Sequence, residues 1–492
     1  MEKILLDVVN TVNNYLTDYV LILLLIGVGI FFTVRTKFVQ VRCFGEGVKQ
    51  VFGNIKFRGG KQHGGISSFQ ALATAIAAQV GTGNIVGACG AIFVGGPGAI
   101  FWMWIIAFLG MSTIYAEATL AQKTKKVGED GAAVGGPVYY IKAAFRGKFG
   151  KFLAGFFAVA AMLALGFMGA MVQSNSIASN FANAFSQFAS AESANTVKSV
   201  TGIVVGVIVA AIAAFILIGG VQRLASVAEK IVPIMATLYL VGGLIVLCVN
   251  VTAIPATFGM IFKYAFVPNA LIGGGVGYAI KLAVSQGAKR GLFSNEAGMG
   301  STPHSHALAN VDDPHKQGVA AMIGVFIDTF VVLTMTALVV ISTLYASEGA
   351  VITPETYGGL VEAGFSSATM AQTAFSATFT KIFGGNAAIG NAVGSLFVAM
   401  CLFFFAFTTI ISWNYYGKVN FEHLFGKKAA IVYSIVAVGF IFLGSILSND
   451  LVWALTDFFN YLMVIPNVIA LITLSGMVAE CAKRRKDLPK IK

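Results

Sequence analysis

Charged residues are scarce in this chain of 492 amino acids: Asp, Glu, Lys and Arg make up 11% of it, whereas 57% is hydrophobic. A mean hydropathy of +0.81 leaves little room for a large soluble domain and indicates a polytopic membrane protein. Cysteine is also scarce, and the five cysteines are scattered without CxxC or metal-ligand spacing. We interpret them as packing thiols.

Several motifs of catalysis and energy transduction are missing. The sequence has no HExxH or GxSxG motif, which disfavours an intramembrane enzyme, and no Walker motif, so ATP hydrolysis is not expected to drive it. An ion channel would normally show a pore loop or rings of like residues built by oligomerisation. The favoured class is a secondary transporter driven by an ion gradient, with one pathway per protomer and function as a monomer.

Apolar segments long enough to cross a bilayer are abundant, and the basic residues orient them. Of the 33 Lys and Arg residues, 28 fall on one side of the predicted topology and four on the other. This asymmetry predicts a multi-pass protein of the cell membrane, with the N-terminus outside and the C-terminus cytoplasmic. Basic loops facing anionic lipid explain the net charge of +12, so no nucleic-acid partner is expected. The eleven predicted spans are 16–34, 66–95, 98–122, 152–188, 201–219, 231–250, 271–288, 317–345, 387–416, 429–447 and 451–478.

The second span contains the sequence QVGTGNIVG, Gln79 to Gly87, where helix is expected to fail. Gly81 and Gly83 are poor helix formers, and Asn84 competes for backbone hydrogen bonds. Irregular backbone at membrane depth is tolerated where it lines a cavity or binds something, and transporters bind cargo there. The alternative is a glycine-rich face for helix packing.

Spans two to eleven divide into two sets of five, and each set opens with a glycine-interrupted span. The second such span is 271–288, with glycines at 273, 274, 275 and 277. Two odd sets in series have opposite topology, as in inverted-repeat transporters. The expected fold is therefore an all-α 5+5 inverted repeat with one extra N-terminal helix. The expected divisions are 1–65 (N-terminal helix and basic segment), 66–250 (first repeat), 251–478 (second repeat, with outer loop 346–381) and 479–492 (basic tail).

Five stretches carry a resemblance to a known family. The segment Gly95 to Glu117, GGPGAIFWMWIIAFLGMSTIYAE, closely resembles the signature of the alanine or glycine:cation symporters. The resemblance implies a LeuT-type fold, no enzymatic activity and Na⁺-coupled uptake of alanine or glycine. The other matching stretches are GTGNIVG (81–87), GGPVYYI (135–141), KRGLFSNEAGMGS (289–301) and SWNYYG (412–417).

A looser resemblance assigns roles at the break. In related amino acid:sodium symporters the first core helix unwinds at Val-Gly-x-Gly-Asn, and Val80 to Asn84 has this form. The resemblance implies that backbone N–H groups of Thr82 and Gly83 bind the substrate carboxylate. Carbonyls of Ala77 and Val80 would face a sodium ion, and Asn84 would serve substrate or a second ion.

Further sodium ligands are implied by FFFAFTTIISW. Phe405, Thr408 and Thr409 have i, i+3, i+4 spacing, so a carbonyl and two hydroxyls share one helix face. In LeuT-type symporters the eighth core helix completes a sodium site with this spacing. The alternative is that both hydroxyls bond to their own helix. Trp413, one helical turn after Thr409, could form the floor of the substrate pocket, or it could pack against neighbouring helices without a role in binding.

Amide groups inside the membrane are candidate substrate ligands. Gln173 lies well inside the fourth span and could bind a carboxylate or join helices. Gln79 could contact ligand or cap the half-helix before the break. Phe167, about two turns before Gln173, is a candidate for an apolar pocket wall.

Ionisable residues within membrane spans are candidate functional residues. Asp328 is central in the eighth span, and proton coupling is therefore the alternative to Na⁺. Glu117 and Glu296 lie near predicted cytoplasmic helix ends beside basic residues, where a gate salt bridge and a helix cap are both possible. The histidines at 304, 306 and 315 are expected in a solvated loop, because HxH alone is a weak metal signal.

Overall fold

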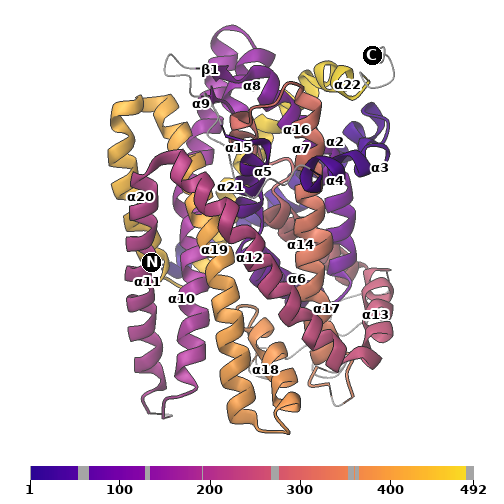
Figure 1. Ribbon diagram of the computed structural model, residues 1–492, viewed down its shortest axis with the longest axis vertical. Coiled ribbons are helices and arrows are strands. Elements are labelled where there is room, and N and C mark those ends of the chain that lie inside the picture. Colours follow the sequence, from indigo (N-terminus) through magenta and orange to yellow (C-terminus); the bar gives the residue numbers. More distant parts are fainter. Residues whose placement is uncertain are drawn as a thin grey trace.

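The computed structural model describes residues 2–53, 66–127, 133–190, 192–266, 276–348, 350–352, 360 and 365–483. Most of its helices run along one direction, which is vertical in Figure 1. The upper end carries α8 (Pro137–Ala144), α22 (Ser475–Lys483) and a two-stranded hairpin, β1 (Lys126–Val127) with β2 (Ala133–Val134). The lower end carries α13 (Ile254–Phe266) and α18 (Met370–Ile382). The predicted all-helical character is confirmed.

The N-terminal segment forms one long helical run followed by two short helices. The run consists of α1 (Glu2–Tyr15), the π-helical η1 (Leu16–Leu21) and α2 (Ile22–Arg35). The short helices α3 (Val39–Arg42) and α4 (Phe44–Phe52) follow, and α4 packs on α16. Residues 54–65 of the predicted basic segment lie outside the described residues.

The first predicted repeat begins with a broken helix. Its remaining helices end within two residues of the predicted spans, but α12 begins at Gly220, about three α-helical turns before residue 231. The elements are α5 (Ser68–Gln79), η2 (Gly83–Gly87), α6 (Ala88–Gly95), α7 (Ala99–Thr124), α9 (Gly147–Ala161), η3 (Met162–Gly169), α10 (Ala170–Ser186), α11 (Ala194–Ile218) and α12 (Gly220–Val249). A capping box between Ser67 and Gln70 starts α5.

The second predicted repeat also contains a long helix followed by a break and a short helix. The elements from residue 251 on, besides those already given, are η4 (Val251–Ala253), α14 (Val276–Asn295), α15 (Pro303–Leu308), α16 (Pro314–Val325), η6 (Phe326–Leu333), α17 (Thr334–Leu344), α19 (Ala387–Phe425), η8 (Lys427–Ala429), α20 (Ala430–Gly444) and α21 (Asn449–Thr473). The tail beyond Lys483 lies outside the described residues.

Every predicted span contains helix in the structure. By helix length and composition, however, fewer helices are identified as membrane spans. Among the described residues eight helices are long and apolar enough to cross a membrane, or nine when the bent pair Ser68–Gln79 and Gly83–Gly95 counts as one. The helix α2 is apolar but shorter. The structure therefore supports a polytopic membrane protein.

The described part of the second glycine-interrupted span is helical, and a break follows it. Glycines 273–275 lie outside the described residues, and α14 continues past residue 288 to Asn295. The chain breaks after Asn295 and resumes helix at Pro303. Lys289 and Arg290, which we assigned to a cytoplasmic loop, therefore lie within α14. Hydropathy located the span but not its end, because a polar stretch buried by its neighbours continues the helix.

Two broken helices lie at the centre of the fold. Helix α14 packs on α6 and α7, whereas α5 packs on α12, α15 and α19. The start of α5 and the end of α15 meet in a short parallel bridge, with the Ile66 amide 3.3 Å from the Leu308 carbonyl oxygen. The two interruptions themselves are in contact, because the Gln79 side-chain nitrogen donates to the Asn295 carbonyl oxygen at 2.8 Å.

Candidate functional site

The first break lies where the sequence predicts it. Helix α5 ends at Gln79, and the chain turns by 47° between α5 and the helical stretch from Gly83 to Gly95. All residues from Val80 to Gly87 are buried. Asn84 stabilises the turn, since its side-chain oxygen accepts a hydrogen bond from the Gly81 N–H at 3.0 Å. The interruption is therefore a defined structure rather than a frayed helix.

Gln173 reaches the break from α10. Its side-chain oxygen accepts a hydrogen bond from the Thr82 N–H at 3.0 Å, which is the N–H expected to bind a carboxylate. The Thr82 hydroxyl is buried and has no hydrogen-bond partner among the described residues. A carboxylate would supply the kind of acceptor that both groups need.

Backbone and hydroxyl oxygens gather between α5 and α19. The Thr409 hydroxyl lies 3.0 Å from the Ala77 carbonyl oxygen, 3.1 Å from that of Ala78 and 3.1 Å from that of Phe405. The Thr408 hydroxyl lies 2.9 Å from the same Phe405 oxygen. This set of neutral oxygens fits the chemistry of a small hard cation carried as cargo. Val80 is buried beside it, at the end of α5.

Gly81 faces both groups of ligands. A Cβ added there would lie 2.3 Å from the Thr409 hydroxyl oxygen and 3.1 Å from the Gln173 side-chain oxygen. Gly83 points elsewhere: its added Cβ would lie 3.0 Å from Cα of Ser294 on α14. The absence of a side chain at Gly83 therefore lets η2 approach α14, which differs from the expected reason, access for a carboxylate.

Asp328 connects the two halves of the site. It is fully buried in η6, where the Asn84 amide donates to its Oδ1 at 2.6 Å and the Ser294 hydroxyl donates to its Oδ2 at 2.9 Å. The hydroxyl of Thr329 also donates to Oδ2. Gln79 makes a parallel connection, because its side-chain nitrogen donates to the Asn295 carbonyl oxygen at 2.8 Å.

The second break is held by two buried carboxylates. Glu117 on α7 accepts hydrogen bonds from the N–H groups of Gly298 and Gly300 and from the side-chain nitrogen of Asn467. Glu296 accepts from Trp413 Nε1 at 2.6 Å and from the Ser301 hydroxyl. Within the part of the chain that the structure describes, no basic side chain bonds to either group, and both hold the turn after α14 instead of forming the expected gate salt bridge or capping their own helices.

An aromatic series joins the second break to the N-terminal part of α21. Trp413 packs edge-on against Phe293, with ring centres 5.6 Å apart, and Phe293 lies 4.7 Å from Trp453. Phe167, expected in the pocket wall, instead stacks on Tyr433 and Phe440 of α20. The π-helical η3 presents Gly169 to the Trp413 ring. Such a bulge changes which side chains face inward, which periodicity does not reveal.

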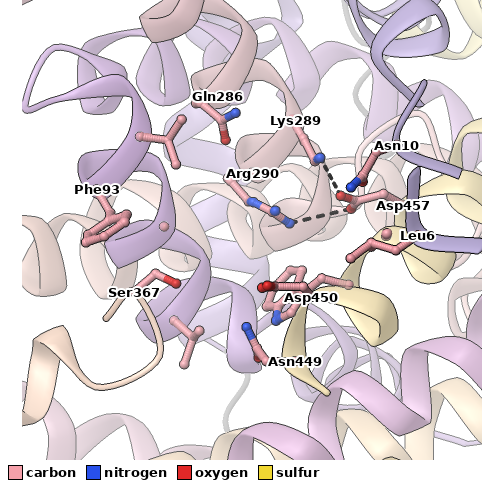
Figure 2. Close-up of a pocket in the computed structure, with 15 residues that line it drawn as sticks. Leu6, Asn10, Phe93, Gln286, Lys289, Arg290, Ser367, Asn449, Asp450 and Asp457 are labelled. Carbon is pink, nitrogen blue, oxygen red and sulfur yellow. Dashed lines mark hydrogen bonds and ion pairs between the residues drawn. The ribbon is translucent and has the colours of Figure 1, made fainter. Parts of the chain in front are cut away.

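A cavity of about 330 Å³ lies beyond this aromatic series, on the α6 side of the first break. Figure 2 shows Lys289 and Arg290 of α14 directed toward Asp457 of α21, with separations of 2.6 and 3.5 Å. The Arg290 guanidinium also lies over the Trp453 ring, 4.3 Å from its centre. Asp457 is 2% exposed, so its carboxylate is buried where the two basic side chains meet it.

The predicted solvated histidine loop is also wrong. His304 and His306 are buried in α15, where His304 stacks on Tyr416 and its Nε2 faces the Asn420 side-chain nitrogen at 2.9 Å. Burial lowers the pKa of His304 to about 4 and that of His306 to about 3, so both are neutral near pH 7. His315 is buried as well, at the start of α16.

Sequence reasoning missed the residues that connect the two breaks. Ser294, Asn295 and Phe293 all lie at the end of α14, within the motif that supported the resemblance, yet none was assigned a role. The sequence feature that could have identified these residues is the run of polar residues just before a glycine-rich turn. The structure brings the predicted residues Gln79, Thr82, Asn84, Gln173 and Asp328 together with them.

Two broken helices whose interruptions meet in the core of a polytopic helical protein define a secondary transporter. Comparisons with known proteins agree: the chain belongs to the sodium:alanine symporter family, whose profile matches residues 1–489.

Named relatives cover nearly the whole chain. The sodium/alanine symporter AgcS of Methanococcus maripaludis is 38% identical over 486 residues, covering 98% of both chains. A Bacillus subtilis protein named putative sodium/proton-dependent alanine carrier YrbD is 39% identical over 480 residues, covering 95% of this chain and 90% of its own. The probable sodium/glutamine symporter GlnT of the same organism is 37% identical over 487 residues, covering 98% and 91%.

Proposed function

We propose that this protein imports a small neutral amino acid, alanine or glycine or both, together with Na⁺ by alternating access. The proposal includes the LeuT-type 5+5 inverted repeat, eleven spans, an outer N-terminus and a cytoplasmic C-terminus. The observation that carries it is the Thr409 hydroxyl within 3.1 Å of carbonyl oxygens from both α5 and α19.

Sodium would bind among these oxygens. Ala77, Val80 and Phe405 would contribute carbonyls, and Thr408 and Thr409 would contribute hydroxyls. In the described arrangement the Thr409 hydroxyl donates its proton to the carbonyls. A bound cation would take the carbonyl oxygens, and the hydroxyl would turn its own oxygen toward the ion. Neutral ligands suit this task because release of the ion then requires no protonation step.

The substrate would replace an internal contact at the break. Its carboxylate would take the place of the Gln173 side-chain oxygen on the Thr82 N–H and would also accept from the unpartnered Thr82 hydroxyl. The amide of Gln173 could then turn to donate its N–H to the same carboxylate. The backbone at Gly81 lies close to the side-chain oxygens of Gln173 and Thr409. The space between them is therefore narrow, which favours a substrate with a small side chain.

Asn84 and Asp328 would keep the break in shape during this exchange. The Asn84 side chain bonds the Gly81 N–H on one side and Asp328 on the other. The Asp328 carboxylate also supplies negative charge near the site, which attracts both Na⁺ and the ammonium group of the substrate. Trp413 would act through Glu296 and Phe293, as part of the wall behind the break.

The cavity shown in Figure 2 would be the outer approach to this site. Trp453 lines the cavity and contacts Phe293, whose ring lies 3.1 Å from a Cβ added at Gly83. The pairing of Asp457 with Lys289 and Arg290 ties α21 to α14 across the approach. Opening of the path would require these contacts to separate.

Proton coupling is the second candidate, favoured by the buried carboxyl group of Asp328 and by the name of the relative YrbD, a putative sodium/proton-dependent alanine carrier. The two candidates are separated by uptake of radiolabelled alanine into proteoliposomes under an imposed Na⁺ gradient or an imposed pH gradient. We expect accumulation with the Na⁺ gradient alone. Accumulation driven equally well by the pH gradient without Na⁺ would contradict Na⁺ coupling.

The same vesicles test the substrate class. Unlabelled alanine and glycine should compete with labelled alanine, and glutamine should compete more weakly because Gly81, Gln173 and Thr409 leave little room for its longer side chain. The glutamine comparison matters because one relative is named a probable glutamine symporter. Stronger competition by glutamine than by alanine would overturn the proposed substrate class.

A further inference from the structure

Cys43, Glu46 and His315 converge away from the transport site, where the N-terminal segment meets α16. One possible ligand atom from each residue, the Cys43 sulfur, a Glu46 carboxylate oxygen and a His315 ring nitrogen, lies within 4.8 Å of the other two. Cys43 directly precedes α4, Glu46 is in its first turn, and His315 is in the first turn of α16. The cluster therefore joins two elements that are distant in the sequence.

The histidine ring is oriented as in a metal site. Its Nδ1 forms a hydrogen bond with the Tyr115 hydroxyl at 2.7 Å, and its Nε2 faces Glu46 Oε2 at 3.2 Å. Metal-binding histidines usually engage the second ring nitrogen in such a bond, which fixes the ring. The backbone N–H of His315 is also held, by the carboxylate of Asp313 at 2.9 Å.

Close packing of α4 on α16 makes the cluster rigid. A Cβ added at Gly47 would lie 2.8 Å from the Val319 carbonyl oxygen, so glycine allows the two helices to approach. The Phe44 ring packs edge-on against Phe326, with centres 4.9 Å apart. Cys43 is buried, whereas the Glu46 side chain is 18% exposed and leaves a route for an ion from solvent.

We propose that Cys43, Glu46 and His315 form a Zn²⁺ site that fastens α4 to α16. Sulfur, imidazole nitrogen and carboxylate oxygen are the three ligand types that zinc accepts, whereas Na⁺, Mg²⁺ and Ca²⁺ select oxygen. Ligand atoms about 2.0–2.3 Å from a tetrahedral zinc ion lie about 3.3–3.8 Å apart. Separations of at most 4.8 Å therefore need only a small inward movement, and water completes the coordination. Binding converts the Cys43 thiol to a thiolate and releases its proton to solvent.

The test uses the full chain without a histidine tag, purified in lipid nanodiscs and freed of metal by a chelator. We expect one Zn²⁺ per chain with a Kd below about 1 µM, measured by competition with a chromophoric chelator. Cys43→Ser and His315→Gln should each weaken binding by about 100-fold or more. Glu46→Gln, the mildest of the three changes, should weaken it by about tenfold or more.

Two matched variants control for adventitious binding. Cys248→Ser removes the exposed cysteine of α12, and His423→Gln removes a histidine that faces Lys142 instead. Both should retain wild-type Zn²⁺ affinity. Loss of affinity in these controls equal to that in the Cys43 and His315 variants would overturn the proposal, as would unchanged affinity in the latter pair.

Cobalt provides a readout on the unmodified chain that does not depend on folding of a variant. Co²⁺ bound by Cys43 should give a near-ultraviolet sulfur-to-cobalt charge-transfer band together with the visible bands of a tetrahedral ion. Zn²⁺ should abolish both on stoichiometric addition. A bound Co²⁺ spectrum without the sulfur band, or failure of the wild-type chain to bind either ion, would refute the site.

Discussion

The two breaks at the centre of the molecule are held in different ways. At the first, neutral side chains hold the turn: Asn84 lies within it, and Gln173 and Thr409 reach it from α10 and α19. At the second, two fully buried carboxylates, Glu117 and Glu296, bond to the backbone and side chains of the turn.

Backbone geometry reinforces this difference. Gly298 and Gly300 have φ of 93° and 81°, and Glu296 itself has φ of 59°. Residues other than glycine seldom adopt this backbone conformation. Several hydrogen bonds converge on the side-chain oxygens of Glu117 and Glu296, so these two residues can maintain a strained turn. Neutral contacts exchange more readily for ligands. The first break is therefore suited to binding and release, and the second to keeping α14 and α15 in place.

The largest expected effect is loss of the second break. Glu117→Ala leaves the N–H groups of Gly298 and Gly300 and the Asn467 amide buried without their acceptor. Each such group costs about 1–3 kcal/mol, so we expect a loss of at least about 3 kcal/mol and little folded protein. Thermal unfolding followed by fluorescence-detected gel filtration measures this effect.

Glu117→Gln is the matched control, since it keeps one acceptor oxygen and should lose less stability than the alanine variant. A melting temperature of the alanine variant equal to that of the wild type would contradict the structural role of the second break.

At the first break, Gly81→Ala should abolish transport while the protein still folds. The added methyl carbon would lie 2.3 Å from the Thr409 hydroxyl oxygen and 3.1 Å from the Gln173 side-chain oxygen. We expect uptake to fall by about 100-fold, equivalent to about 2.7 kcal/mol, at near-normal expression. Alanine uptake into proteoliposomes, normalised to reconstituted protein, is the measurement.

Gly27→Ala is the control for that variant, because an added Cβ there meets nothing within 4 Å. Near-normal uptake by the Gly81 variant would show that this face of the break does not bind cargo.

Gly83→Leu tests the contact between η2 and α14. The leucine side chain would push against Ser294 and Phe293 of α14, so fold and substrate binding should be lost together.

Asp328→Asn examines the connection between the two breaks. The carboxylate accepts from Asn84 on one oxygen and from Ser294 and Thr329 on the other, so an amide NH₂ would face donors on either side. We expect Na⁺-driven uptake to fall by about tenfold but to persist, as loss of one or two hydrogen bonds implies. Complete loss of driven uptake with exchange retained would instead support a proton-carrying role.

Thr409→Val should have the smallest effect, confined to Na⁺. The isosteric change removes a hydroxyl that contacts both α5 and α19, and we expect the Na⁺ concentration for half-maximal uptake to rise about fivefold. Thr408→Val should change it less, since the Thr408 hydroxyl bonds to the Phe405 carbonyl oxygen and the Met235 sulfur and, among the described residues, to no carbonyl of α5. Equal Na⁺ dependence in the wild type and the Thr409 variant would remove this hydroxyl from the site.

Composition and local propensity determined much of this protein. The structure has helix in every range where apolar length predicted a membrane span, and poor helix formers from Val80 to Asn84 predicted the first break. These features depend on neighbouring residues along the chain, so a single sequence contains them. The amide of Gln173 was identified for the same reason: a polar group inside an apolar segment is conspicuous without any knowledge of its partners.

Tertiary structure alone decided which groups meet. The bonds from Asn84 to Asp328 and from Glu117 to Gly298 and Gly300 span 244, 181 and 183 residues. No local pattern encodes such pairs. Hydropathy did not locate the break after Asn295 because α14 is polar at its end yet buried by its neighbours. The π-helical η3 shifts the helical register, so periodicity did not reveal that Phe167 stacks on Tyr433 and Phe440. Burial and register depend on the packed helices, which hydropathy along the chain does not contain.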